Sequence, residues 1–189
     1  MSELWEKMRQ GDAEAMLMLY ELHYNDLLSY GVQLCGSIHT SKDAVNDVFL
    51  NLGEQYKNLG PVKNVKAYLF ACLRRSIFQL PYANSKVISV GEASIYNETE
   101  TSYEDMLIEI QQSDALRMKI GMALNKLTGR QRELIQLKYF QNLSYSQIEA
   151  ATGISIKTAY NTIYSALKAL ESELRGLLAG IFLFISLFF

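Results

Sequence analysis

The side chains that could carry out acid–base or metal chemistry in this 189-residue chain are few and far apart. The histidines, His23 and His39, lie outside any metal-ligand spacing, and so do the cysteines, Cys35 and Cys72. The cysteines also form no disulfide framework, which favours a reducing compartment such as the cytoplasm. The sequence therefore predicts no metal site and no cofactor.

Paired carboxylates are the other feature that could support catalysis. Asp43 and Asp47 are one helical turn apart, and Glu171 and Glu173 are close in sequence. Such charged positions usually lie on the solvated faces of helices. No glycine-rich phosphate loop, nucleophile elbow or paired metal motif accompanies them. We therefore expect no catalytic residue and no enzyme, and we interpret the chain as a protein that binds macromolecules.

The strongest pattern for such binding runs from Leu143 to Leu170. Ser144 and Ser155 are suited to cap two successive helices. Gly153 lies at the turn between them, where a positive φ is expected. This is the pattern of a helix-turn-helix, whose second helix enters the DNA major groove, and the alternative is a helical hairpin in some other all-α protein. The apolar residues expected to join the two helices are Ile148, Ile156, Ile163 and Leu167.

Charge is distributed unevenly along the chain. Residues 1–81 carry 8 basic and 9 acidic residues, residues 82–113 carry 1 and 6, and residues 114–175 carry 9 and 5. The basic excess therefore coincides with the helix-turn-helix pattern, as contact with DNA phosphates requires. Because this excess is modest, we expect weak DNA binding from residues 114–175 alone.

Helical patterns extend over most of the rest of the chain, which is 49% hydrophobic and contains only two prolines. Asp12 is suited to cap one helix, and Ser41 is suited to cap another after a break at residues 35–37. A further helix is predicted over residues 65–75, ending near Pro81. The N-terminal residues are too polar for a signal peptide.

These patterns predict an all-α fold of two small helical domains joined by an acidic linker, the second containing the helix-turn-helix. We place the first domain at residues 1–81, an acidic flexible linker at 82–113 and the second domain at 114–175. Residues 176–189 form a hydrophobic C-terminal tail, of which residues 177–189 are 13 uncharged residues. A membrane-spanning helix needs about 20 such residues, so burial against the protein or a partner is favoured over contact with a membrane surface.

Four segments resemble, in order, segments of the extracytoplasmic-function (ECF) sigma factors of the sigma-70 family. No single segment is decisive, but the ordered set is specific, and it spans roughly residues 8–78 and 114–172. The segments are Gly11–Tyr20, similar to the opening of the core-binding domain; Ser41–Leu52, similar to the second-region helix; Asn64–Arg75, similar to the promoter-melting segment; and Leu127–Leu134, which with the helix-turn-helix resembles the fourth region.

The resemblance implies a sigma factor that binds core RNA polymerase at its β′ clamp helices and β flap. Such a factor directs the polymerase to specific promoters and helps to melt the DNA, while the polymerase performs the chemistry. The resemblance also implies an anti-sigma factor as a partner, since factors of this type are commonly held inactive by one. A cytoplasmic location is expected from the cysteine pattern described above.

The resemblance assigns three sets of contact residues. The residues expected to face the β′ clamp helices are Asp43, Asn46, Asp47 and Leu50. The residues expected to meet the minus-ten promoter element are Lys63, Asn64, Lys66, Tyr68, Arg74 and Arg75. The residues expected at the minus-thirty-five element are Arg130, Arg132, Ser155, Lys157, Thr158, Tyr160, Asn161, Tyr164 and Lys168.

Within these sets the side-chain types suggest different tasks. Arg74 and Arg75 are expected to hold phosphates rather than to read bases. Asn161 is the best candidate for a base contact, because an Asn amide pairs bidentately with adenine. For Tyr68, stacking on an extruded base and packing in the core are both open.

Several positions depart from the family pattern. Glu149 replaces a small residue, Thr162 and Ser165 replace arginines that the family often carries, Gly53 stands where a Trp is frequent, and Phe78 replaces a polar residue. These departures predict weak or degenerate recognition of the minus-thirty-five element, or dependence on core polymerase for affinity.

Two other functions fit the same residues. The first is a helix-turn-helix regulator that binds an operator without polymerase, which requires a dimer and two half-sites. The second is a membrane-associated helical adaptor that uses the hydrophobic tail.

Overall fold

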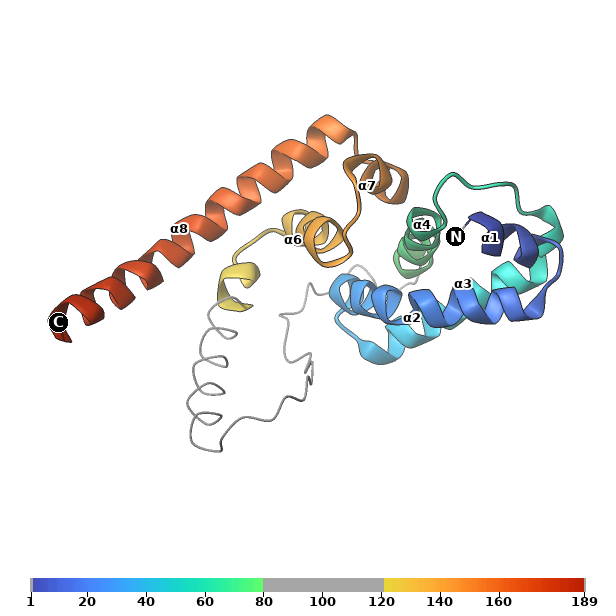
Figure 1. Cartoon of the computed structure of the whole chain (residues 1–189), viewed down its shortest axis with the longest axis horizontal. Helices are drawn as coiled ribbons and strands as arrows, with labels where there is room; N and C mark the ends of the chain where they lie inside the picture. The colour runs from blue at the N-terminus through green and yellow to red at the C-terminus, as the bar shows by residue number, and fades with distance from the viewer. Residues whose placement is uncertain (1, 80–120, 189) are drawn as a thin grey trace.

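The computed structural model describes residues 2–79 and 121–188, with side chains described as far as residue 173. These residues form helices joined by short loops. Within these ranges there is no strand. Figure 1 shows the helices in two groups, one on each side of residues 80–120. The all-α prediction is confirmed. The predicted linker at 82–113 and the side chains of the predicted tail lie outside the described residues.

The first group consists of long helices joined by short turns. Asp12 begins the longest of them as predicted, since its Oδ1 accepts the backbone N–H groups of Glu14 and Ala15 at 2.9 and 3.0 Å. Gly36, with φ of 71°, ends the same helix in the left-handed conformation that glycine adopts readily. The elements are α1 (Ser2–Arg9), α2 (Ala13–Cys35), α3 (Ile38–Gln55), a 3-10 turn (Tyr56–Asn58) and α4 (Val65–Gln79).

The start of α3 differs from the prediction. Ser37 is its N-cap, because the Ser37 hydroxyl accepts the N–H of Thr40 at 3.2 Å. Ser41, which we expected to cap the helix, is fully buried inside it, and its hydroxyl donates to the Ser37 carbonyl at 2.7 Å. Two serines four residues apart offer the same capping chemistry, and the position of the turn at Gly36 selects the earlier one.

The apolar faces of α2, α3 and α4 meet in one core. Trp5 of α1 is also buried there, and its Nε1 donates to the Gly60 carbonyl at 3.1 Å. This bond ties the loop before α4 to α1. Residues of this core with no exposed surface are Leu19, Leu27, Tyr30, Val45, Leu69, Phe70 and Leu73.

The second group includes a helical stretch at residues 121–125 and the helix-turn-helix. Ser144 and Gln147 form a capping box at the first helix of the motif, and Gly153, with φ of 74°, ends that helix. Ser155 accepts the N–H of Thr158 at 3.2 Å and caps the second helix. All three predictions are confirmed. The elements are α6 (Gly129–Ile135), a π-helical turn (Gln136–Phe140), α7 (Tyr145–Thr152) and α8 (Ile156–Phe188).

The packing of the motif agrees with the prediction only in part. Ile148 and Ile163 are buried at 0% and 1% exposure, but Ile156 and Leu167 are 44% and 40% exposed. The inward stripe of α8 consists of Ile163 together with Ala159 and Ala166. Residues three and four apart share one helix face, and Ile156 and Leu167 lie beside this stripe.

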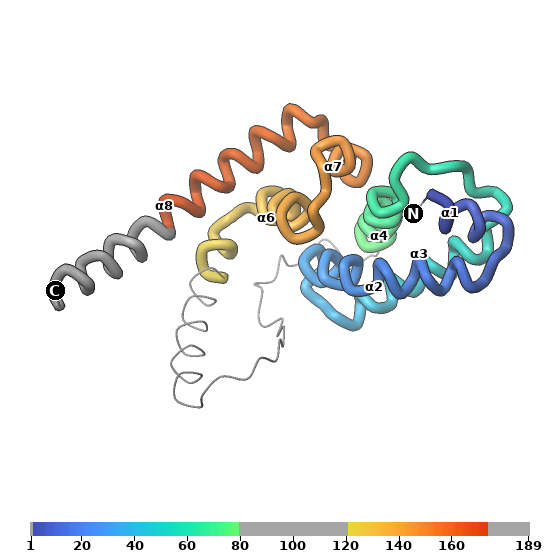
Figure 2. Tube along the Cα trace, viewed as in Figure 1, coloured from blue at the N-terminus to red at the C-terminus, as the bar shows by residue number. Residues whose placement is uncertain are grey.

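The two groups pack against each other. Figure 2 shows α7 beside α4 and α6 above α2. The buried residues of both groups belong to one continuous apolar cluster. In the described part of the chain, no helix combines the length and apolar character needed to cross a membrane.

Candidate nucleic-acid and protein interfaces

One exposed face of α3 carries the residues predicted to meet the polymerase. Asp43, Asn46, Asp47 and Leu50 are all exposed, and Leu50 is 64% exposed despite its apolar side chain. Their spacing of three and four residues places them on the side of α3 opposite its buried residues. Tyr20 of α2 donates its hydroxyl to Asn46 Oδ1 at 3.2 Å, so α2 borders this face.

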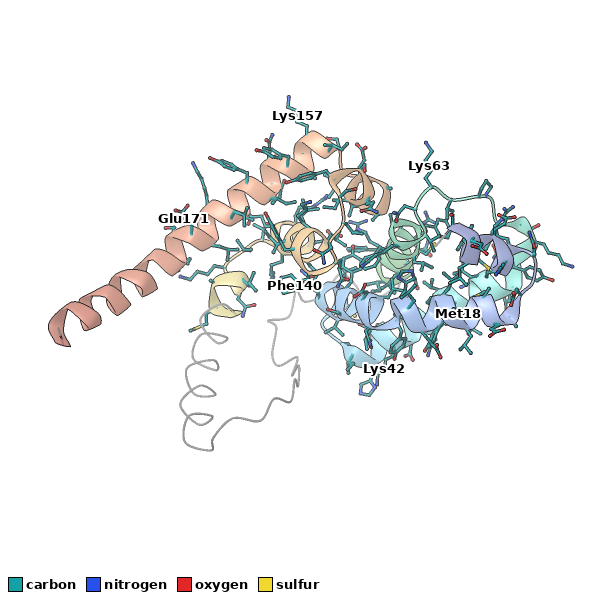
Figure 3. All side chains as sticks on the ribbon, in the orientation of Figure 1. Met18, Lys42, Lys63, Phe140, Lys157 and Glu171 are labelled. Atoms are coloured by element: carbon teal, nitrogen blue, oxygen red, sulfur yellow. The ribbon has the colours of Figure 1, made fainter. Side chains whose placement is uncertain are left out.

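The loop before α4 forms a small hollow of about 90 Å³, lined by Ser2, residues 62–65 and Lys66. Asn64 serves two roles there, because its Oδ1 accepts the N–H of Ala67 at 2.8 Å and so caps α4. The exposed side chain of Lys63 extends away from the ribbon in Figure 3. Lys63, Asn64 and Lys66 thus line the same hollow.

Two of the predicted minus-ten residues on α4 have partners inside the same helical group. Lys66 Nζ lies 2.7 Å from Asp26 Oδ2 of α2. The half-buried ring of Tyr68 meets the Trp5 ring edge-on, with centroids 5.2 Å apart. Burial raises the pKa of the Tyr68 hydroxyl, and the neighbouring Cys72 adds to that effect. Much of the Tyr68 side chain is therefore packed against the protein, as the core-packing alternative expects.

Arg74 reaches out of the first group altogether. Its Nε donates to Glu133 Oε1 of α6 at 2.7 Å, and the hydroxyl of buried Tyr30 donates to the same oxygen at 2.8 Å. We call Tyr30, Arg74 and Glu133 the Glu133 cluster. The guanidinium also lies over the Phe78 ring, 4.7 Å from its centroid. Arg75, the other predicted phosphate contact, is exposed.

The electrostatics of the Glu133 cluster follow from its burial. Burial raises the pKa of Tyr30 well above its ordinary value, and the charge of Glu133 adds to that rise, so the phenol stays a hydrogen-bond donor. Burial by itself lowers the pKa of Arg74. The hydrogen bond and charge of Glu133 outweigh that effect, so the pKa of Arg74 is raised.

The predicted minus-thirty-five residues lie on α6, in the turn before α8 and on α8 itself. Most are exposed, and Lys157 at the start of α8 extends away from the ribbon in Figure 3. Arg132 is partly covered and donates to Asn125 Oδ1 at 3.3 Å. The exposed members are Arg130, Ser155, Lys157, Thr158, Tyr160, Asn161, Tyr164 and Lys168.

The structure adds residues to this surface that the sequence patterns did not indicate. Lys138 lies over the Tyr145 ring, 4.8 Å from its centroid, and that ring lies 5.8 Å from the ring of Tyr160. Glu149, a departure from the family pattern, accepts the N–H of Ile156 at 3.2 Å and so places a carboxylate at the N-terminus of α8. Only the turn between α7 and α8 brings Glu149 to that position.

Known proteins resemble the helix-turn-helix part of the chain and, at lower identity, most of its length. The family model described as Sigma-70, region 4, matches residues 117–170, which contain α6, α7 and the first part of α8. The chain is 28% identical over 169 residues to the ECF RNA polymerase sigma factor SigL of Mycobacterium tuberculosis, covering 87% of this chain and 93% of that protein.

Solved structures share the fold. CnrH, in complex with the cytosolic domain of CnrY, aligns with a TM-score of 0.65 at 19% identity, covering 93% of this chain and 97% of that one. The sigma factor RpoE of Bartonella quintana, in complex with the anti-sigma factor NepR, aligns with a TM-score of 0.59 at 21% identity, covering 84% and 95%. The chain therefore contains a match to sigma-70 region 4 and is similar, over most of its length, to ECF RNA polymerase sigma factors.

Proposed function

We propose that this chain is an RNA polymerase sigma factor of the ECF type. It binds core polymerase, directs it to a subset of promoters and helps to open the DNA, acting in the cytoplasm and leaving bond chemistry to the polymerase. The observation that carries this function is the region 4 match over residues 117–170, in which α8 presents an exposed polar and aromatic face. We assign residues 1–81 to polymerase and minus-ten binding and residues 114–175 to minus-thirty-five binding.

The exposed face of α3 is proposed to bind the β′ clamp helices. Asp43 and Asp47 supply negative charge and Asn46 an amide, while the exposed Leu50 supplies apolar surface that a partner would bury. An exposed Leu among polar residues suits a contact that combines charge complementarity with a small apolar centre. The β flap is the proposed partner of the second domain.

The hollow before α4 is proposed to hold a base extruded from the minus-ten element. Asn64 has amide N–H donors besides the oxygen that caps α4. Lys63 and Arg75 are exposed where a single strand could pass, and aromatic and basic side chains together suit single-stranded DNA. Melting follows because the factor binds the unstacked strand better than the duplex.

The helix-turn-helix is proposed to read the minus-thirty-five element. Asn161 faces the bases, while Arg130 and Lys157 hold phosphates. The recognition helix lacks arginine where Thr162 and Ser165 stand, so base-specific contacts are few. Duplex binding by the second domain therefore falls steeply with added salt.

An anti-sigma factor is a further proposed partner. The solved RpoE neighbour is bound to the anti-sigma factor NepR, and the CnrH neighbour is bound to the cytosolic domain of CnrY. Both neighbours cover more than four fifths of this chain. A partner of that kind would compete with polymerase for the exposed helix faces.

Co-purification of the tagged chain with bacterial core RNA polymerase, followed by permanganate footprinting of promoter DNA, tests the function. We expect stoichiometric binding and newly reactive thymines upstream of a start site. Asp47→Lys should weaken polymerase association at least tenfold, because it reverses a charge on the exposed α3 face. Glu21→Lys, an equal change on the exposed face of α2, should leave it unchanged. A folded chain that binds no polymerase would instead favour the operator-binding regulator.

A further inference from the structure

A buried carboxylate lies at the contact between the two helical groups. The second group carries it, and the first group donates hydrogen bonds to it. The Glu133 side chain on α6 is 7% exposed. Its Oε1 accepts hydrogen bonds from Tyr30 on α2 and Arg74 on α4, at sequence separations of 103 and 59 residues. Beside it, Gln136 Nε2 donates to Ser29 Oγ at 3.1 Å.

Such a contact is specific to one arrangement of the two groups. A buried carboxylate requires partners, and Glu133 obtains both of its hydrogen-bond donors only while α6 lies against α2 and α4. The bond from Arg74 is charge-assisted, which makes it stronger than a bond between neutral groups. If the groups separate, Glu133 regains water and Arg74 becomes free to bind another anion.

The anion that Arg74 is proposed to bind during promoter melting is a DNA phosphate. A carboxylate oxygen and a phosphate oxygen are equivalent acceptors for a guanidinium, and both are held in similar geometry. Glu133 occupies the Nε–H of Arg74, so a phosphate that uses this N–H in a bidentate contact must displace Glu133. The Arg74 side chain keeps 25% of its surface exposed, so an incoming phosphate has a path to it.

We propose that Glu133 is an internal competitor for the DNA phosphate at Arg74, so that α6 must leave α2 and α4 before the first domain takes up single-stranded promoter DNA. This proposal rests on the proposed function in one respect, the assignment of Arg74 to DNA. The helix-turn-helix surface is not involved in the cluster, so its exposed face remains available to duplex DNA while the two groups are in contact.

Binding of the full chain to a fluorescein-labelled dT12 oligonucleotide tests the proposal without polymerase. A phosphate contact reads no base, so the probe needs no promoter sequence. Glu133→Gln keeps the side-chain shape and removes the charge, and we expect it to bind dT12 about threefold to tenfold more tightly at low salt. Glu21→Gln, an equal charge change on exposed surface, should bind like the wild type. Small-angle scattering should show a larger radius of gyration for Glu133→Gln than for the wild type or for Glu21→Gln.

The second arm removes Arg74. In an Arg74→Gln background, Glu133→Gln should give no gain in dT12 affinity, because the guanidinium for which Glu133 and the phosphate compete is gone. Tyr30→Phe, which removes one of the two donors to Glu133, should give a smaller gain, and it provides the test if Glu133→Gln does not fold. Unchanged affinity in both variants, or an equal gain with and without Arg74, would overturn the proposal. Failure to bind polymerase would overturn the proposed function and leave this result standing.

Discussion

The two helical groups present their proposed DNA-binding residues in opposite states. In the first group, Lys66 and Arg74 are paired with carboxylates and Tyr68 packs against Trp5. In the second group, most of the corresponding residues are exposed, as the extended side chain of Lys157 in Figure 3 illustrates. The difference teaches that sequence resemblance locates a binding residue without saying whether it is free to bind.

The position of each helix in the fold explains the difference. The α4 helix packs against α2, α3 and α7, so most of its circumference is covered. The first part of α8 packs against α6 and α7 through its inward stripe and leaves its outer face exposed. Lys66, Tyr68 and Arg74 on α4 therefore meet protein partners, although Arg75 is exposed. Most of the predicted contact residues on α8 meet solvent.

The largest expected effect comes from Ile163→Ala. Ile163 is 1% exposed, and its truncation should lower the free energy of unfolding by about 2–4 kcal/mol. Because the two groups share one apolar cluster, urea unfolding followed by circular dichroism should show a single shifted transition. Tyr164→Ala, at the 53% exposed neighbour, should leave the midpoint almost unchanged. Two separate transitions, with only one shifted, would show that the shared core does not couple the groups.

His23→Leu tests the effect of a buried histidine on the stability of the first group. His23 is 3% exposed, and neither ring nitrogen has a hydrogen-bond partner within the described residues. Burial lowers its pKa, Lys66 lowers it further, and Asp26 opposes the shift in part. Replacing an unsatisfied buried ring with Leu should stabilise the protein by about 1 kcal/mol at neutral pH.

The same variant has a pH signature. The unfolded state takes up a proton on His23 below its ordinary pKa of 6.5, and the folded state does so only at lower pH. Wild-type stability should therefore fall as the pH drops from 6.5 toward the lowered pKa. His23→Leu should remove that part of the decline, while His39→Gln, at an exposed histidine, should retain it. Equal pH profiles for all three proteins would show that His23 does not cause the decline.

Two lysine truncations sharpen the contrast directly. Lys66→Ala should cost roughly 0.5 kcal/mol of stability, since it removes a partly exposed ion pair with Asp26. Lys157→Ala should leave the melting temperature unchanged and reduce the salt slope of duplex binding by about 1. Thermal melts and a salt titration of DNA affinity measure both. A stability loss in Lys157→Ala comparable to that of Lys66→Ala would remove the distinction between the two surfaces.

An effect of similar small size is expected from Glu149→Gln. Its carboxylate lies at the N-terminus of α8, where a negative charge stabilises the helix by about 0.3–1 kcal/mol. The variant should lose that stability and should bind duplex DNA up to about fivefold more tightly, because an anion no longer repels the approaching phosphates. Fluorescence anisotropy with duplex DNA measures this, with Glu21→Gln as the charge-matched control. A gain in the control equal to that in Glu149→Gln would assign the effect to net charge.

Much of the local structure could be predicted from the sequence. Asp12, Ser144, Ser155 and Gly153 occupy the capping and turn positions expected of them. Each of these features depends on contacts within a few residues, so the side-chain type and its place in the pattern are sufficient. The exposed face of α3 follows from helical periodicity in the same way.

Predictions were less accurate where neighbouring residues were equally suited to the same position. Ser37 rather than Ser41 caps α3, because the turn at Gly36 fixes where the helix begins. Ile156 and Leu167 are exposed because α8 turns the stripe of Ala159 and Ile163 toward the core, where it packs against α6 and α7. Neighbouring positions were equally apolar, and only the approach of the second helix selected among them.

The sequence by itself determined the all-α fold, the helix-turn-helix and the positions of the candidate contact residues, because these follow from capping chemistry and helical period. The tertiary structure alone decided which of those residues are free. The partners of Glu133 lie 103 and 59 residues away in sequence, and no local pattern indicates them. Burial of a charge depends on what packs over it, so the pairing of Arg74 is a property of the assembled helices.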